Sequence, residues 1–206
     1  MIANDEVLHR GALITQASKA LILLHGRGGT AHGIMGLADS FSTPQLYIAA
    51  PQASHSTWYP HSFIVEEKLN EPYLSSSIEV VKCLIDTISK HIPPSQTYLM
   101  GFSQGACLAL EVAARFATRY GGVIAFTGGL IGSVIDEKKY RGDFEGTPIF
   151  IGTSDQDPHV PLERAQESKT LLEKLGAQVT LKVYPGMGHT INEDEIGWVR
   201  QNIFLM

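Results

Sequence analysis

The sequence predicts an α/β fold in which helices cover both faces of a mostly parallel sheet of about seven strands. Short β-rich runs alternate with helical patterns along the 206 residues, which is typical of a parallel sheet. Several of these runs are continuously apolar, as strands buried on both faces must be. No linker, repeat or low-complexity tract divides the chain, so residues 1–206 are expected to form a single domain.

The expected strands are recognised by runs of β-branched, aromatic and aliphatic residues. They span residues 7–14, 20–24, 46–51, 97–101, 122–128, 148–153 and 179–185. The first run, VLHRGALI, alternates apolar and polar residues more than the others do. This alternation predicts a strand at one edge of the sheet.

Three helices are recognised by apolar residues three or four positions apart. These residues are Ile78, Val81, Ile85, Ile88 and Ile92 in the first, Leu162, Ala165, Leu172 and Leu175 in the second, and Ile196, Val199 and Ile203 in the third. Ser76 and Glu79 have the spacing of a capping box at the start of the first helix, and Pro93 follows its end. Gly176 is expected to close the second helix as a left-handed cap. Residues 104–119 are apolar on nearly every side, which predicts a further, buried helix.

Composition argues against two classes of partner. The net charge is −5 and no lysine/arginine cluster is present, so no nucleic acid is expected to bind. The first residues do not resemble a signal peptide, and no apolar run is long enough to span a membrane, so no stable membrane insertion is expected. Cys83 and Cys107 lie in helical apolar patterns, which predicts buried free thiols rather than a disulfide. Together these features predict a cytoplasmic protein.

The stretch LILLHGRGGTA, residues 21–31, has two interpretations. It reads as an apolar strand followed by a glycine-rich turn. GRGGTA fits the dinucleotide-binding pattern, in which a helix N-terminus approaches a pyrophosphate. A loop of this kind can also supply a main-chain amide to the oxyanion of an ester under attack. By itself the loop does not distinguish a nicotinamide-binding oxidoreductase from an ester hydrolase.

The stretch GFSQGA, residues 101–106, has the pattern G-x-S-x-G between an expected strand and the buried helix. In this context the serine lies on a sharp, strained turn with its hydroxyl above the sheet. The pattern predicts Ser103 as a nucleophile, with Gly101 and Gly105 where side chains would collide. The Gln104 N–H lies at the helix N-terminus and can face a developing negative charge. A serine that merely caps a helix is the alternative.

A serine hydroxyl needs a base to remove its proton. Among the eight histidines, His189 in YPGMGHT is best placed, because it follows the last strand and lies at the same sheet edge as Ser103. His25 also ends a strand on that edge, but it precedes the serine and is expected to be structural. The other histidines, expected at the surface, are His9, His32, His55, His61, His91 and His159.

An imidazole base needs a carboxylate that sets its tautomer and stabilises its positive charge. Asp155 and Asp157, in GTSDQDPHVP, follow the sixth expected strand. The chain order of Ser103, Asp157 and His189 is the order found in α/β-hydrolases. Aspartates that only cap a turn are the alternative interpretation.

A dinucleotide site would need an acidic residue at the end of the next strand, to hold the ribose hydroxyls. That strand ends in IAAPQAS, residues 48–54, which contains no aspartate or glutamate. The hydrolase interpretation instead needs a loop amide opposite the Gln104 amide. The HGRGG loop supplies one, and the main-chain N–H of Arg27 is the expected donor.

Five separated motifs resemble the phospholipase/carboxylesterase family of small α/β-hydrolases, which is related to the acyl-protein thioesterases and to dienelactone hydrolase. The motifs are LLHGRGG, APQASHSTWYP, GFSQGA, SDQDPHVP and PGMGH, and they extend from about residue 20 to the C-terminus. The resemblance implies an α/β-hydrolase fold, with Ser103 as nucleophile, Asp157 as acid and His189 as base. It also implies main-chain oxyanion donors at Arg27 and Gln104.

The resemblance further implies that Trp58, in STWYP, lies beside the substrate, and Tyr59 is expected to bound the site with it. Relatives commonly dimerise, so a homodimer is one candidate for the oligomeric state. Arg27, Glu66 and Glu67 either select a charged substrate or face solvent, and solvent is favoured. No metal or organic cofactor is expected, because no zinc-like histidine/glutamate spacing occurs.

We therefore expect a serine carboxylesterase that cleaves small carboxylic esters through an acyl-enzyme. Residues 130–146 are too polar to form an apolar lid, so no lid domain is expected. An acyl-protein or acyl-CoA thioesterase, or a lysophospholipase, with the same triad is the alternative. A nicotinamide-binding oxidoreductase is disfavoured by the missing acidic residue, and a non-catalytic binding module by the presence of all three triad residues.

Overall fold

A computed structural model describes residues 7–41 and 43–204, which form a seven-stranded sheet in the order β1-β3-β2-β4-β5-β6-β7. The strands are β1 (Val7–Gly11), β2 (Lys19–Leu24), β3 (Leu46–Pro51), β4 (Thr97–Phe102), β5 (Gly122–Phe126), β6 (Pro148–Ser154) and β7 (Gln178–Tyr184). Strand β1 pairs antiparallel with β3 at one edge, and all other pairs are parallel. The predicted α/β class and the edge position of the first strand are thus confirmed, although β1 is shorter than expected.

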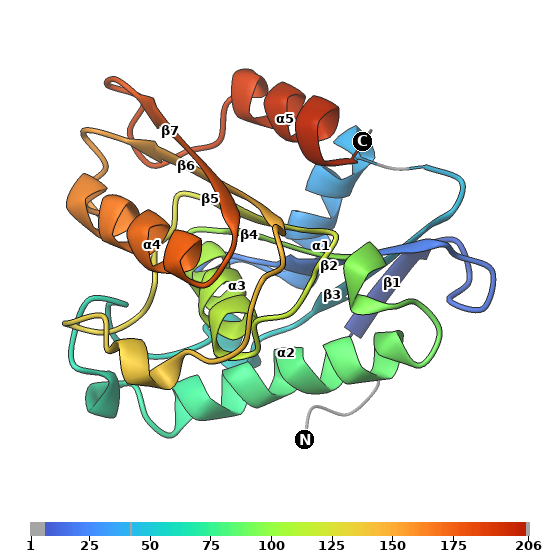
Figure 1. Cartoon of the computed structure of the whole chain (residues 1–206), viewed down its shortest axis with the longest axis horizontal. Helices are drawn as coiled ribbons and strands as arrows, with labels where there is room; N and C mark the ends of the chain where they lie inside the picture. The colour runs from blue at the N-terminus through green and yellow to red at the C-terminus, as the bar shows by residue number, and fades with distance from the viewer. Residues whose placement is uncertain (1–6, 42, 205–206) are drawn as a thin grey trace.

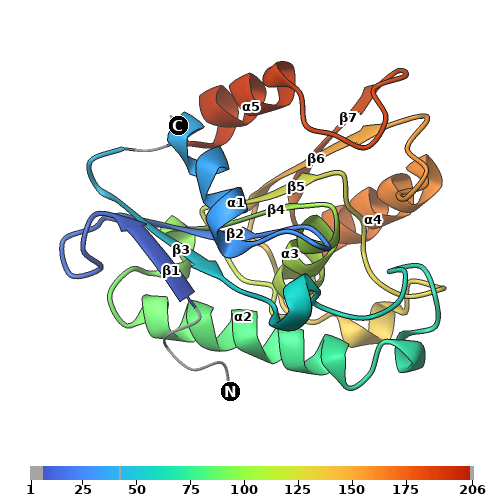
Figure 2. The ribbon, with the colours of Figure 1, turned by 180° about the vertical axis from the view of Figure 1, so that it is seen from behind.

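Helices cover both faces of the sheet (Figures 1 and 2). Helices α1 (Ala31–Met35) and α5 (Glu193–Val199) lie on one face. Helices α2 (Tyr73–Ser89), α3 (Gln104–Arg115) and α4 (Leu162–Lys174) lie on the other. The last helical segment continues as a π-helical turn, Arg200–Phe204. No helix within the described ranges is long and apolar enough to cross a membrane.

The sequence of β2 explains why the central strands are continuously apolar. Successive side chains of a strand point to opposite faces. Ala20, Ile22 and Leu24 pack in the hydrophobic cluster beneath α2, α3 and α4. Leu21 and Leu23 belong to the cluster beneath α1 and α5. Because both faces are buried, neither set of positions can be polar.

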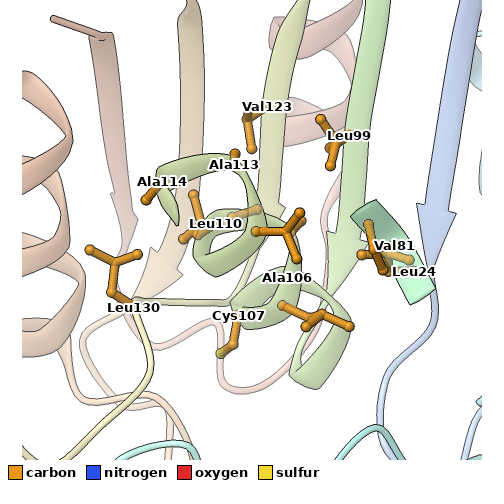
Figure 3. Packing of buried hydrophobic residues seen from close by; sticks show 14 of the residues in the cluster. Leu24, Val81, Leu99, Ala106, Cys107, Leu110, Ala113, Ala114, Val123 and Leu130 are labelled. Carbon is orange, nitrogen blue, oxygen red and sulfur yellow. The ribbon is translucent and has the colours of Figure 1, made fainter. Parts of the chain in front are cut away.

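Helix α3 lies at the centre of the larger cluster, with Ala106, Cys107 and Leu110 among its packed side chains (Figure 3). Each residue of the helix from 104 to 114 is buried. Its buried Glu111 accepts hydrogen bonds from Arg115 Nε at 2.7 Å, Tyr140 Oη at 3.0 Å and the Ile131 N–H at 2.9 Å. These bonds hold the 130–146 segment against the helix. The segment expected to be too polar for a lid is therefore packed onto the body of the protein.

Two expectations about helix α2 are wrong. The helix begins at Tyr73 after Pro72, and the Ser76 N–H already donates to the Pro72 carbonyl at 3.1 Å. Ser76 lies inside the helix and therefore cannot be a non-helical N-cap. The Cys83 thiol is exposed, whereas Cys107 is buried as expected, and both are free. Val81, two positions before Cys83, lies on the buried face of the helix. Because residues two apart do not share a helix face, Cys83 points away from the core.

Other helix boundaries follow from turn chemistry. Gly176 adopts a φ of +85° just after α4, as expected of a left-handed cap. An unpredicted capping box starts α5, where the side chains of Asn192 and Glu195 each accept the other residue's main-chain N–H. Strand β5 ends two residues earlier than expected, next to Thr127 at a φ of +58°.

The buried carboxyl group of Glu195 is expected to make the stability of the fold depend on pH. Its side chain is buried against Gly152, and only one of its carboxylate oxygens has a hydrogen-bond partner among the described residues, the Asn192 N–H at 2.8 Å. Burial raises the pKa of this carboxyl from 4.5 to about 7. Because the folded pKa lies above the unfolded one, the contribution is complete below pH 4.5 and is lost as the pH rises through about 7.

We expect the melting temperature of the wild type to fall between about pH 5 and pH 8 more steeply than that of Glu195→Gln, which keeps the capping geometry and cannot ionise. Thermal unfolding followed by circular dichroism measures both curves. Parallel curves for the two proteins would contradict the assignment.

Candidate active site

Ser103 lies on the sharp turn between β4 and α3. Its backbone adopts φ 54° and ψ −119°, and its N–H donates to the Phe126 carbonyl at 2.9 Å. A Cβ atom on Gly101 would lie 2.3 Å from the Gly105 carbonyl carbon, and one on Gly105 would lie 2.1 Å from the Leu24 carbonyl oxygen. Glycine is therefore required at both positions for strand and helix to close around the serine.

A continuous chain of hydrogen bonds joins Ser103, His189 and Asp157. His189 Nε2 lies 2.8 Å from Ser103 Oγ, and His189 Nδ1 lies 2.7 Å from Asp157 Oδ2. Asp157 Oδ1 accepts the N–H groups of His159 at 2.8 Å and Val160 at 3.0 Å. The carboxylate is fully buried, so these bonds fix its orientation and satisfy the charge that supports the imidazole.

Asp155, the other acidic candidate, does not contact the imidazole but bonds to the backbone of the loop that carries His189. Its Oδ1 accepts the Gly186 N–H at 2.7 Å. The neighbouring Ser154 Oγ accepts the Gly188 N–H at 3.2 Å. The acid loop after β6 therefore has two roles: Asp157 contacts the imidazole, and Ser154 and Asp155 position the backbone that carries it.

Two main-chain N–H groups lie beside Ser103 with no hydrogen-bond partner among the described residues: those of Arg27 and Gln104. The Gln104 N–H is at the first position of α3, where the helix dipole favours negative charge. A Cβ on Gly26 would lie only 3.4 Å from Ser103 Cβ, so the loop after β2 is packed directly against the serine. This arrangement can hold an oxyanion.

His25 stabilises the loop that follows β2. Its ring is buried, and burial lowers its pKa. Its Nε2 accepts the Ala53 N–H at 3.1 Å, so Nδ1 carries the proton and donates to the Gly26 carbonyl at 2.8 Å. One ring nitrogen thus bonds within the loop after β2 and the other bonds to the loop after β3, which agrees with the structural role expected for His25.

A cleft of about 690 Å³ opens above Ser103. Its walls come from residues 26–27, 59–64, 102–104, Cys107, 158–161 and His189. Two rings orient the imidazole of His189: Phe102, with its centroid at 5.2 Å, and His159, edge-on at 4.8 Å. All six histidines expected at the surface are exposed, but His61 and His159 also line the cleft, which their sequence context did not indicate.

Trp58 does not line the catalytic cleft, so its expected contact with substrate is corrected. The side chain is buried, and the indole N–H donates to the His25 carbonyl at 2.8 Å. Its backbone N–H donates to Gln104 Oε1 at 3.0 Å, while Gln104 Nε2 donates to the Tyr59 carbonyl at 2.8 Å. Trp58 thus supports the wall of the cleft, and its neighbour Tyr59 is among the residues that line it.

If Arg27 acts through its main-chain N–H, Arg27→Ala keeps most of kcat for p-nitrophenyl acetate. Arg27→Pro removes the donor and is expected to lower kcat by about 10² to 10³-fold, the usual cost of deleting one oxyanion donor. Steady-state kinetics measures both, with circular dichroism as the control for misfolding. Equal losses in the two variants would show that the guanidinium, and not the amide, carries the effect.

The phospholipase/carboxylesterase family model matches residues 12–205 of this chain. A crystal structure of a phospholipase/carboxylesterase from Dyadobacter fermentans is 47% identical, with a TM-score of 0.94, and the match covers 96% of this chain and 95% of that one. Acyl-protein thioesterase 1 of Saccharomyces cerevisiae is 28% identical, over 92% of this chain and 93% of the yeast protein. A probable carboxylesterase of Oryza sativa subsp. japonica is 26% identical, over 89% and 77% of the two chains.

The family match spans nearly the whole chain, from the loop before β2 to beyond the last helical turn. The structural match is also nearly complete, and it is supported by sequence identity as well as by fold. The predicted fold and family are therefore confirmed: this chain belongs to the phospholipase/carboxylesterase family of α/β-hydrolases and is a carboxylic ester hydrolase.

Proposed function

We propose that the enzyme hydrolyses small carboxylic esters with Ser103 as nucleophile, His189 as base and Asp157 as the acid that orients the base. The observation that carries this proposal is the unbroken chain of hydrogen bonds, 2.7 and 2.8 Å long, from the buried carboxylate to the serine hydroxyl. The chain ends at an open cleft, beside two main-chain amides that have no partner among the described residues.

In the first half-reaction, His189 Nε2 removes the proton from Ser103 Oγ as the oxygen attacks the ester carbonyl. The carbonyl oxygen gains a negative charge, which the N–H groups of Arg27 and Gln104 stabilise. The imidazolium gives its proton to the departing alkoxide, and an acyl-serine remains. Water, activated by the same imidazole, then attacks the acyl carbon and releases the acid and the free serine.

Covalent labelling tests this assignment directly. A fluorophosphonate probe reacts with an activated serine, and mass spectrometry of the digested protein locates the adduct. We expect a single adduct on Ser103 that disappears when the protein is denatured before labelling. An adduct elsewhere, or no labelling by the native enzyme, would contradict the proposal.

The shape of the cleft favours short substrates. Its walls are mostly loops, with Tyr59 and residues 158–161 among them, and no residue of the 130–146 segment is among the described residues that line it. An open cleft buries few methylenes, and each buried methylene contributes only about 0.8 kcal/mol. A long acyl chain therefore gains little binding energy beyond its first carbons.

We expect a higher kcat/KM for p-nitrophenyl acetate or butyrate than for the palmitate ester, with no activation at lipid interfaces. Initial rates measured below and above the micellar concentration of each substrate decide this. A preference for palmitate, or a sharp rise in rate above the micellar concentration, would instead favour a lipase or a depalmitoylating enzyme.

A thioesterase or lysophospholipase that uses the same triad is the second candidate. Its support is the similarity, over 92% of this chain, to a yeast protein named acyl-protein thioesterase 1. Hydrolysis of butyryl-CoA and palmitoyl-CoA, followed through the released thiol, compares the two candidates on equal acyl groups. The cytoplasmic location and the homodimer remain predictions, and light scattering after gel filtration measures the oligomeric state.

A further inference from the structure

We propose that the cleft selects esters that carry a second functional group, a free carboxylate, which binds the guanidinium of Arg27. The inference rests on the proposed esterase function and specifies the substrate class of the same site. It depends on two features of the cleft: a cation that is held in place, and the absence of acidic side chains among the described residues that line it.

The guanidinium of Arg27 is held in place by neutral oxygens. Nη1 donates to Thr57 Oγ1 at 3.2 Å and to the Pro60 carbonyl at 2.8 Å, and Nη2 donates to the His61 carbonyl at 2.6 Å. An arginine has five N–H donors, so two of them, on Nε and Nη2, have no partner among the described residues. Two such donors match the two oxygens of a carboxylate.

The charge of Arg27 is not neutralised by the protein. No aspartate or glutamate is among the described residues that line the cleft. Glu66 pairs with Lys68, and Glu67 pairs with Arg115 at 3.0 Å. These two acids directly follow the cleft-wall residues 59–64 in the sequence, but both are paired with other cations. The two histidines of the cleft wall, His61 and His159, carry no negative charge in either protonation state.

The ring of Tyr59 supports this cation from the wall of the cleft. The carbon of the Arg27 guanidinium lies over the ring, 6.0 Å from its centroid, an arrangement in which a cation and an aromatic ring attract each other. The Tyr59 side chain is 1% exposed, and its hydroxyl is buried beside the thiol of Cys107. The exposed guanidinium is therefore the group that can meet a substrate carboxylate.

Three ethyl esters of nearly equal size provide the test: monoethyl adipate, ethyl adipamate and ethyl 6-methylheptanoate. They end in a carboxylate, a carboxamide and an isopropyl group, which have similar shapes and differ in charge and hydrogen bonding. A pH-stat at low ionic strength measures kcat/KM for each. We expect the carboxylate ester to exceed the carboxamide ester by about tenfold or more, and this ratio to fall as salt is added.

Variants assign the preference to Arg27. Arg27→Met keeps the main-chain N–H and is expected to bring the carboxylate-to-carboxamide ratio close to one. Arg141→Met removes an exposed arginine outside the cleft and should leave all three values unchanged. Ratios are compared because Arg27 also supports the loop that contains Pro60 and His61.

The outcomes separate the inference from the proposed function. Equal kcat/KM values for the three esters in the wild type, or a preference that survives in Arg27→Met, would overturn the inference and leave the esterase proposal intact. A loss in Arg27→Met that is equal for all three esters would show only structural support, and would also overturn it. No hydrolysis of any ester, with no fluorophosphonate adduct at Ser103, would overturn the proposed function itself.

Discussion

Replacing Ser103 with alanine is expected to lower kcat by about 10³-fold or more while leaving the fold intact. The variant keeps the two main-chain amides beside the site but lacks the oxygen that attacks the ester. Alanine keeps the β-carbon of serine, so the substitution removes only the hydroxyl and its hydrogen bond to His189. The strained turn, with a φ of 54° at this residue, is therefore expected to persist.

Hydrolysis of p-nitrophenyl acetate measures this loss, and thermal unfolding verifies the fold. Ser76→Ala is a matched control, because Ser76 is an exposed serine on α2 outside the catalytic cleft, and its rate should equal that of the wild type. More than a tenth of wild-type activity in Ser103→Ala would rule out Ser103 as the nucleophile.

Replacing Asp157 with asparagine is expected to lower kcat by up to about 10⁴-fold at neutral pH. The N–H groups of His159 and Val160 both donate to Asp157 Oδ1. In the variant they would hold the amide oxygen at that position and leave the NH₂ group facing His189 Nδ1. The histidine would then carry its proton on Nε2, where it cannot accept the serine proton.

The same change at Asp155 separates the two roles of the acid loop. Asp155→Asn keeps an oxygen that can accept the Gly186 N–H, so its effect on kcat should be much smaller. Both variants are compared in kcat across the pH range, with the wild type as reference. A larger loss in Asp155→Asn than in Asp157→Asn would reverse the assignment of the acid.

The sequence by itself determined the elements whose chemistry is local. The glycines on either side of Ser103 predict the strained turn, because only glycine permits the close approach of strand and helix there. The buried strands and helix α3 are visible as apolar runs, since burial on every side leaves no polar position. The position of His189 after the last strand also followed from the rule that parallel strands present their carboxyl ends at one edge.

Only the tertiary structure decided which neighbouring residue faces which partner. Asp155 and Asp157 are two positions apart on one loop, and the contact with His189, 32 residues later, selects Asp157. Trp58 and Tyr59 are adjacent in sequence, but only Tyr59 lines the cleft. Hydrogen bonds from the Trp58 indole to His25 and from Gln104 to the Tyr59 carbonyl fix this arrangement.

The side-chain environment of Arg27 also lay beyond the sequence, because its three acceptors come from a loop 30 to 34 residues away. Likewise, Cys83 has an apolar helical neighbourhood in sequence, but the face that α2 presents to the sheet leaves its thiol exposed. Periodicity and turn residues report local conformation. Contacts between distant segments depend on how strands, helices and loops pack, and no short pattern encodes that packing.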